Sequence, residues 1–402
     1  MMSKKSPQLR FEGFTDAWEE RKLGELSNIV GGGTPSTSNP EYWDGDIDWY
    51  APAEIGEQSY VSKSKKTITE LGLKKSSARI LPVGTVLFTS RAGIGNTAIL
   101  AKEATTNQGF QSIVPVQNKL DSYFIFSRTN ELKRYGEVTG AGSTFVEVSG
   151  KQMSKMSIMV PELSEQQKIG SFFKQLDKTI ALHQRKLDLL KEQKKGYLQK
   201  MFPKNGAKVP ELRFAGFADD WEERKLNEVS DIYDGTHQTP KYQDNGVMFL
   251  SVENIKTLTS NKFISREAFE DEFKIRPQRG DVLMTRIGDI GTANVVETDE
   301  DLAYYVSLAL FKSEELNPYF LQSSIYAPFV QDQIWKRTLH IAFPKKINKN
   351  EIGQVPINVP TLAEQTKIGS FFKQLDNTIT LHQRKLDLLK EQKKGFLQKM
   401  FV

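Results

Sequence analysis

The chain has 402 residues, with 55 Lys and Arg against 50 Asp and Glu and a net charge of +5. It contains no cysteine and only four histidines, which excludes disulfides, thiol nucleophiles and Cys-ligated metals. No run of roughly 18 apolar residues occurs, and no apolar stretch follows the basic first residues as in a signal peptide. We therefore expect a cytoplasmic protein that makes no membrane contact.

The chain is an internal duplication. A short segment, here called the strap, occupies residues 7–23 and recurs at 210–226, and residues 160–202 recur at 359–401 with only six of 43 positions changed. The stretches between these repeats resemble each other only in islands, chiefly residues 84–95 and 280–291. We predict a first domain at 1–159, a helical segment at 160–202, a second domain at 203–358 and a second helical segment at 359–402.

The repeated segments have the heptad pattern of a coiled coil, with apolar residues alternately four and three positions apart. The predicted seam residues are Ile169, Phe173, Leu176, Ile180, His183, Leu187 and Leu190 in the first copy, and Ile368, Phe372, Leu375, Ile379, His382, Leu386 and Leu389 in the second. About 38 helical residues correspond to a rod of roughly 57 Å. Because the linker after the first helix is short, we favour antiparallel packing, and we take Ser164 as the first helix's N-cap.

Order, spacing and duplication together resemble the specificity subunit of type I restriction–modification enzymes. The residues that carry the resemblance are Leu9, Arg10, Phe11, Trp18 and Glu19, the Gly-rich islands, and the P-x-L-x-E-Q-x-K-I motif at 161–169, with the same elements in the second half. The resemblance implies an α+β protein with two α/β target recognition domains and two long helices packed as an antiparallel coiled coil, related by a pseudo-twofold repeat.

The resemblance also implies which functions belong to this chain and which belong to partner subunits. Each recognition domain would read one half of a bipartite double-stranded DNA site, while the helices would set the gap and bind two modification subunits, which are adenine methyltransferases. Restriction subunits would complete the complex. The sequence has no phosphate-binding loop, methyltransferase pocket motif or nucleophile elbow. We therefore expect a non-catalytic chain that binds no metal or cofactor, with S-adenosylmethionine, ATP and Mg²⁺ on partner subunits.

Three kinds of segment in each domain are candidates for contacting DNA: a turn-rich segment after the strap, the end of the Gly-rich island, and a small or basic cluster before the helix. The residues are Gly33, Thr34, Ser36, Thr37, Thr89, Ser90, Arg91, Ser143 and Thr144 in the first domain, and Thr236, His237, Gln238, Thr239, Thr285, Arg286, Lys336, Arg337 and His340 in the second. The alternatives are ordinary surface turns, and for the arginines a role in holding the loop.

Other residues have both a structural and a functional interpretation. Trp43, Trp49 and Tyr50 could contact bases, although core packing is the commoner role of aromatic residues. His183 and His382 suggest a metal pair or a pH switch, whereas polar seam residues that set the helix register are the simpler account.

Two other functions compete with DNA specificity. Asp16 with residues 20–22 loosely resembles a metal nuclease motif. The same sequence recurs in the second strap, where no strand pattern supports a nuclease site. A structural scaffold with two protein-binding end domains is the main alternative, because duplication alone does not distinguish it from a DNA-specificity subunit.

Overall fold

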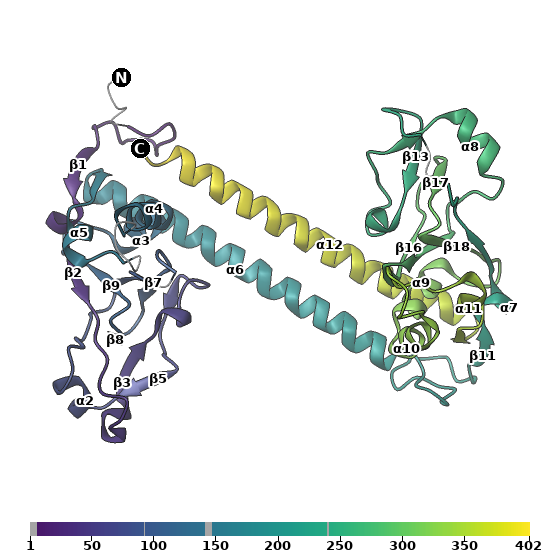
Figure 1. Cartoon of the computed structure of the whole chain (residues 1–402), viewed down its shortest axis with the longest axis horizontal. Helices are drawn as coiled ribbons and strands as arrows, with labels where there is room; N and C mark the ends of the chain where they lie inside the picture. The colour runs from purple at the N-terminus through teal and green to yellow at the C-terminus, as the bar shows by residue number, and fades with distance from the viewer. Residues whose placement is uncertain (1–5, 92, 141–146, 239–240) are drawn as a thin grey trace. The chain divides into compact units, whose positions relative to one another are not determined.

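The structure is a computed structural model that describes residues 6–91, 93–140, 147–238 and 241–402. The chain forms two compact units, which we describe separately (Figure 1). Unit 1 combines Met1–Gln184 with Arg384–Val402, and unit 2 is Arg185–Gln383. Each unit therefore contains one globular domain together with parts of both long helices, α6 (Leu163–Lys200) and α12 (Leu362–Lys399).

The described residues of the first domain form three sheets with short helices around them. The sheets have the strand orders β2-β9-β6-β7-β4, β5-β3-β8 and β1-β10. The strands are β1 (Glu19–Lys22), β2 (Ser27–Gly31), β3 (Trp43–Tyr50), β4 (Tyr60–Val61), β5 (Lys66–Ile68), β6 (Val86–Phe88), β7 (Thr97–Leu100), β8 (Thr105–Thr106), β9 (Gln111–Pro115) and β10 (Ser157–Val160). The helices are α1 (Leu23–Leu26), α2 (Glu70–Lys74), α3 (Ser122–Ser127), α4 (Thr129–Gly140) and α5 (Gly150–Ser154), with 3₁₀ turns η1 (Pro40–Tyr42) and η2 (Pro52–Glu54).

The second domain repeats this order of elements, except that η1 and β4 have no counterpart in its described residues, and its sheets are β12-β18-β15-β16, β14-β13-β17 and β11-β19. Its strands are β11 (Glu222–Lys225), β12 (Asp231–Asp234), β13 (Val247–Leu250), β14 (Phe263–Ile264), β15 (Val282–Ile287), β16 (Asp289–Val295), β17 (Leu302–Tyr304), β18 (Leu308–Lys312) and β19 (Pro356–Val359). Its helices are α7 (Leu226–Val229), α8 (Arg266–Glu272), α9 (Pro318–Tyr326), α10 (Pro328–Arg337) and α11 (Lys349–Gly353), with the 3₁₀ turn η3 (Val252–Asn254). The predicted α+β class is confirmed, and the duplication extends to the parts whose sequences diverge.

The two long helices pack antiparallel within each unit, as predicted. In unit 1, Phe172 stacks edge-on against Phe396 with ring centroids 5.0 Å apart, and the Asp177 carboxylate lies 2.6 Å from Lys393 Nζ. In these two contacts the residue number rises on α6 and falls on α12, so the two helices run in opposite directions. Unit 2 repeats the contacts, with Tyr197 against Phe371 at 4.9 Å and Lys194 against Asp376 at 2.6 Å. All fourteen predicted seam residues are buried or half-buried.

The start of α6 differs in detail from the prediction. The helix begins at Leu163, so Ser164 lies inside its first turn, and its hydroxyl contacts Glu162 instead of capping the helix. In the second copy, Thr361 Oγ1 accepts a long hydrogen bond of 3.4 Å from Glu364 N. The cap position is therefore two residues earlier than Ser164, at a site where the two copies differ in sequence.

The strap is a structural clamp. Its strand β1 pairs antiparallel with β10, immediately before α6, and in the second strap, where the sequence showed no strand pattern, β11 pairs with β19 in the same way. Arg10 then makes a bidentate ion pair with Glu165, both bonds 2.7 Å long, and the Glu165 side chain is completely buried. The hydrogen bond to Glu165 raises the pKa of Arg10 above its usual value. Arg213 and Glu364 repeat the pair in unit 2, also at 2.7 Å.

Breaking this clamp should destabilise the unit that contains it. Arg213→Ala leaves the Glu364 carboxylate buried without its partner, which we expect to lower the free energy of unfolding by about 2 kcal/mol. Urea unfolding of the full chain measures the change. Replacing both residues by Met removes the unpaired charge and should recover most of the loss. If the single and double variants lose equal stability, burial of Glu364 is not the cause.

Each long helix has a glycine where the domain rests against it. A Cβ on Gly369 would lie 2.4 Å from Asn317 Oδ1, which caps α9 by accepting from Tyr319 N and Phe320 N. Gly170 has the same relation to Asp121 at 2.3 Å. Beside these glycines, Gln365 Oε1 accepts from Asn317 N at 2.9 Å, and Gln166 does the same for Asp121 N. The repeated E-Q-x-K-I-G motif thus supplies the residues through which each domain packs against its long helix.

The two glycines of α12 give a matched test of this docking. Gly369→Ala should destabilise the chain by about 1–3 kcal/mol, because the added methyl group displaces the Asn317 cap. Gly395 has no atom within 4 Å of an added Cβ, so Gly395→Ala should stabilise the same helix by about 0.5–1 kcal/mol. Opposite shifts in thermal unfolding are the expected result. Equal shifts would mean that only helix propensity matters.

Membrane insertion has no support among the described helices. None of them combines the length and the apolar character that crossing a bilayer requires.

Candidate nucleic-acid interface

In the second domain, Arg286 at the end of the island joins the turn-rich segment to the chain that follows the basic cluster. Its guanidinium pairs through Nη1 with Asp234, where the turn-rich segment begins, and Nε donates at 3.1 Å to the carbonyl oxygen of Ile347, seven residues after His340. Thr285, next to it, is buried, and its Oγ1 accepts from Thr292 N at 3.0 Å. Arg286 is only 6% exposed. This burial favours its structural alternative, in which it holds the three loops together.

The first domain has a similar convergence around Arg91. Thr89 and Ser90 are buried at the end of β6, and Thr89 Oγ1 donates to Gly93 O at 2.7 Å, which shapes the turn. Ser90 N donates to Gly109 O at 2.8 Å, while Arg91 lies 3.9 Å from the Glu147 carboxylate. Arg91 is half-buried, unlike Arg286, so of the two arginines it is the more accessible to a phosphate.

The turn-rich segment of the first domain joins the same cluster. Gly33 N donates to Thr106 O at 2.8 Å, and Trp49 Nε1 donates to Gly33 O at 2.8 Å. A Cβ on Gly32 would lie 1.9 Å from the backbone of Asn107, so glycine is required there for close approach. Thr34 hydrogen-bonds Gln108. The turn-rich segment and the end of the island are therefore joined in each domain, through residues 106–109 in the first and through Arg286 and Asp234 in the second.

The predicted contact residues differ in their exposure. Those that lie on the surface are Ser36, Thr37, His237, Gln238, Lys336 and His340; Gly33, Thr89, Ser90, Thr285 and Arg286 are buried; Thr34, Arg91, Thr236 and Arg337 are intermediate. Ser143, Thr144 and Thr239 lie outside the described residues. Contact with DNA through the exposed set stays a prediction. The buried Thr89 and Thr285 hydroxyls bond the backbone of their own turns, whereas the buried Ser90 Oγ makes no hydrogen bond within the described residues.

Two aromatic candidates belong to the core. Trp49 and Tyr50 are 6% and 2% exposed, and burial raises the pKa of Tyr50 to about 12, so its hydroxyl stays protonated. Trp43 is half-buried and packs edge-on against Trp49 at 5.1 Å. The core alternative therefore describes these residues better than base contact.

Sequence reasoning missed a pair of apolar side chains in the second domain. Ile341 and Phe343 follow His340 and are fully exposed, at 99% and 104% of their reference areas. A signal was present, because an apolar triplet at 341–343 follows a basic helix end and precedes Pro344, Lys345 and Lys346. No periodic element could bury such a triplet.

Metal coordination finds no support among the described residues. Within that part of the chain, no three His, Asp or Glu side chains are grouped closely enough to hold a metal ion. His183 and His382 are half-buried at their seam positions.

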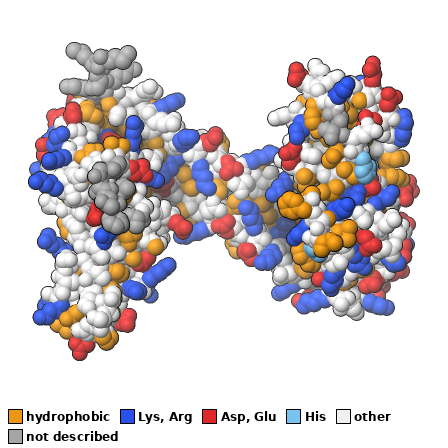
Figure 2. Space-filling view, in the orientation of Figure 1, with side chains coloured by type: hydrophobic (Ala, Val, Ile, Leu, Met, Phe, Trp, Pro, Cys, Tyr) orange, Lys and Arg blue, Asp and Glu red, His pale blue; other side chains and the backbone are white. Residues whose placement is uncertain are grey.

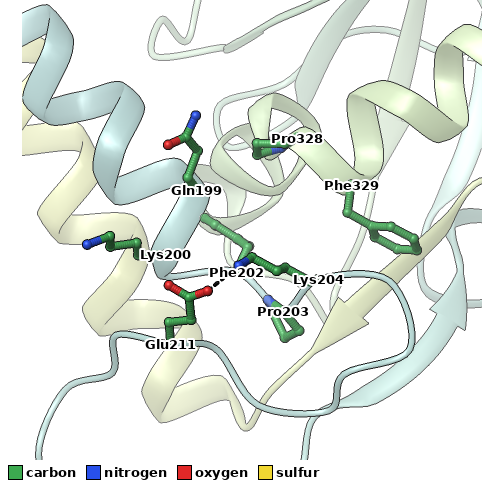
Figure 3. A pocket seen from close by; sticks show the side chains of 8 residues that line it. All are labelled: Gln199, Lys200, Phe202, Pro203, Lys204, Glu211, Pro328 and Phe329. Carbon is green, nitrogen blue, oxygen red and sulfur yellow. Dashed lines mark hydrogen bonds and ion pairs between the residues drawn. The ribbon is translucent and has the colours of Figure 1, made fainter.

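A cavity of about 310 Å³ in unit 2 lies where the chain leaves α6 (Figure 3). It is lined by Gln199, Lys200, Phe202, Pro203, Lys204, Glu211, Pro328 and Phe329, and its one acid is paired with Lys204. None of the predicted DNA-contacting residues reaches it. The cavity lies between the end of α6, the linker, the strap and the start of α10.

Charge is mixed over the visible surface. Figure 2 shows blue and red side chains interspersed over each unit, with hydrophobic side chains between them. A single-sign field over a whole face, which binds any polyanion, is not seen in this view. DNA contact by such a protein would depend on local clusters like those described above.

Comparison with known proteins identifies the family. A profile described as "Type I restriction modification DNA specificity domain" matches residues 15–192 and again 218–391. The chain belongs to this family. The two matches span most of the chain and correspond to the two halves of the duplication, so the resemblance inferred from the sequence is confirmed.

Individual members of the family differ in how much of the chain they match. The type I restriction enzyme MjaIX specificity subunit of Methanocaldococcus jannaschii is 36% identical over 178 residues, which is 44% of this chain and 41% of that one. The chain thus spans about two fifths of this relative's length. The MjaVIII specificity subunit of the same organism is 23% identical over 398 residues, covering 94% and 91%. The crystal structure of a type I S subunit from M. genitalium shares the fold, with a TM-score of 0.67, 13% identity and 99% coverage of both chains.

Proposed function

We propose that this chain is the non-catalytic, DNA-binding specificity subunit of a type I restriction–modification complex in the cytoplasm. Each domain reads one half of a bipartite DNA site, and the antiparallel helices fix the gap between the halves. Two modification subunits carry S-adenosylmethionine and methylate adenine, and restriction subunits use ATP and Mg²⁺ for cleavage. The observation that carries the proposal is a contrast within the duplication: straps, helices and islands recur, while the turn-rich segments and the segments before the helices differ in sequence.

Salt-dependent binding to DNA tests the first part. With the modification subunits present, affinity for random-sequence duplexes should fall at least about tenfold between roughly 50 and 200 mM salt, because phosphate contacts release counterions. Exchange of residues 24–159 for those of a relative should alter one half-site and leave the other unchanged, which methylome sequencing can read. A flat salt response would support the protein-binding scaffold instead.

The partner surface is supported by a second apolar stripe on the helices. Each helix carries two leucines seven residues apart that the seam leaves at least half exposed: Leu182 and Leu189 on α6, Leu381 and Leu388 on α12. Leucines at such spacing project from one side of a helix and favour packing against another helix. The stripe recurs at equivalent positions, so it fits two copies of one partner.

Substituting this stripe separates partner binding from stability. The double variant Leu182→Glu with Leu381→Glu should lose the complex with modification subunits in light scattering, while its thermal unfolding stays close to that of the parent because both sites are exposed. Ala181→Glu, at the neighbouring exposed position, is the control and should bind normally. A complete complex with the double variant would place the partner elsewhere.

A further inference from the structure

The loop of residues 338–346 in the second domain has an unusual apolar tip. Ile341 and Phe343 are both fully exposed. Monomeric proteins expose single apolar side chains often, but two large ones at a loop tip indicate a contact surface. Thr338 and Ile347, at the two ends of the loop, are 6% and 0% exposed. The chain therefore buries the ends of the loop and leaves the tip outside.

Backbone hydrogen bonds hold the base of this loop. Leu339 N donates to Lys346 O at 2.8 Å, so the two sides of the loop are joined across its neck. Gly288 N donates to Lys345 O at 2.8 Å, and Ile347 N donates to Arg286 O at 2.9 Å, which ties the loop to the β15–β16 turn. The buried Arg286 thus has an indirect role, because it positions the loop that bears the tip.

Cations surround the tip. Residues 333–350 contain five Lys or Arg and no Asp or Glu. Lys345 Nζ lies 4.8 Å from the centroid of the Trp335 ring, and the His340 ring, tilted by 54°, has its centroid 4.0 Å from the same indole, so these three side chains form one exposed cluster at the side of the loop. Lys336 is also on the surface and pairs with Asp332 at 2.5 Å.

We propose that this loop enters a groove of duplex DNA, where Phe343 and Ile341 make apolar contacts with bases while Lys345 and Lys346 contact the flanking phosphates. Apolar side chains read thymine methyl groups and base steps in this way. The charge pattern favours DNA over a protein partner, because charged residues are depleted from the apolar core of protein interfaces. This inference rests on the proposed function and names residues that determine specificity for the second half-site.

The experiment uses the full chain with its modification subunits. Duplexes that are long enough for two half-sites one helical turn apart are selected from a fluorescein-labelled random library by the parent complex, and affinities are measured by anisotropy. Phe343→Ala, Ile341→Ala and their combination are compared with Ile275→Ala, an exposed apolar residue elsewhere in the second domain. Lys346→Ala tests the phosphate contact.

The variants should separate base contact from backbone contact. We expect Phe343→Ala to weaken binding to the selected duplex about tenfold, with little change on unselected duplexes. Lys346→Ala should weaken both alike and flatten the salt dependence. Ile275→Ala should bind as the parent does, and thermal midpoints should stay unchanged because every substituted apolar residue is exposed.

Failure of the inference and failure of the proposed function give different results. If the parent complex selects no sequence and shows no salt dependence, the proposed function itself is wrong. If the parent selects a site that Phe343→Ala and the double variant bind equally well, the loop does not read bases. Loss of complex formation with modification subunits, with DNA selection intact, would overturn the proposal by making the tip a protein contact.

Discussion

Deletion of Met400, Phe401 and Val402 is expected to destabilise the first domain, even though these residues are the last of the chain. Met400 is 3% exposed and belongs to the core of unit 1, where the Phe401 ring contacts Trp18, Phe124 and Phe173 at centroid distances of 6.2, 5.6 and 5.8 Å. In Figure 1 the C-terminus accordingly lies beside the N-terminal strap of the same unit. Removing both side chains should lower the free energy of unfolding by about 5 kcal/mol, since each leaves a cavity.

Hydrogen exchange localises the effect of this deletion. Amides of β1, β10 and α3 in unit 1 should exchange faster, while β11, β19 and α9 in unit 2 keep their protection. The control is deletion of Val402 alone, which is 40% exposed and should change little. Phe202→Ala, the equivalent change in the other unit, should speed exchange in unit 2 and leave unit 1 protected. The Phe202 ring contacts Trp221, Phe320 and Phe372 at centroid distances of 6.0, 5.9 and 6.0 Å. Equal loss of protection in both units would contradict the assignment.

The parts of the fold that could be predicted from the sequence are those with a period or a repeat. The seam and the 38-residue length of both helices follow from heptad spacing, because a helix buries every third or fourth residue. The duplication then supplied the partner helix and, through the short linker, its direction. The strap strand β1 was missed because it pairs with β10, far along the chain, and no local pattern encodes that pairing.

The candidate site was predictable only as a set of segments. Its turns and island ends were recognised from glycine and polar residues, but which side chains face inward depends on distant partners. Arg286 illustrates this, since its partners Asp234 and Ile347 lie 52 and 61 residues away. The exposed tip at Ile341 and Phe343 has the opposite origin: apolar residues in a short loop have no element to bury them, and only the fold shows that nothing else covers them.

A half-chain of residues 1–206 should be a homodimer. Its first domain lacks Met400 and Phe401, which complete the core of unit 1 in the full chain. The half-chain contains the equivalent residues Met201 and Phe202, but a helix places Phe202 about 43 Å beyond Phe173, too far to fold back onto its own core. A second copy can supply them, because residues 185–200 differ from 384–399 at only position 197.

Sedimentation of the half-chain measures this directly, with a dimer expected at micromolar concentration. The double variant Met201→Ala with Phe202→Ala removes the exchanged side chains, so it should be monomeric and lose most of its stability, whereas Lys200→Ala, an exposed neighbour, should dimerise normally. With modification subunits bound, the dimer should read a symmetric site built from two copies of the first half-site, because a twofold protein reads a palindrome. A stable half-chain monomer at tens of micromolar would mean that the first domain completes its core without a partner helix, contrary to the packing around Phe401.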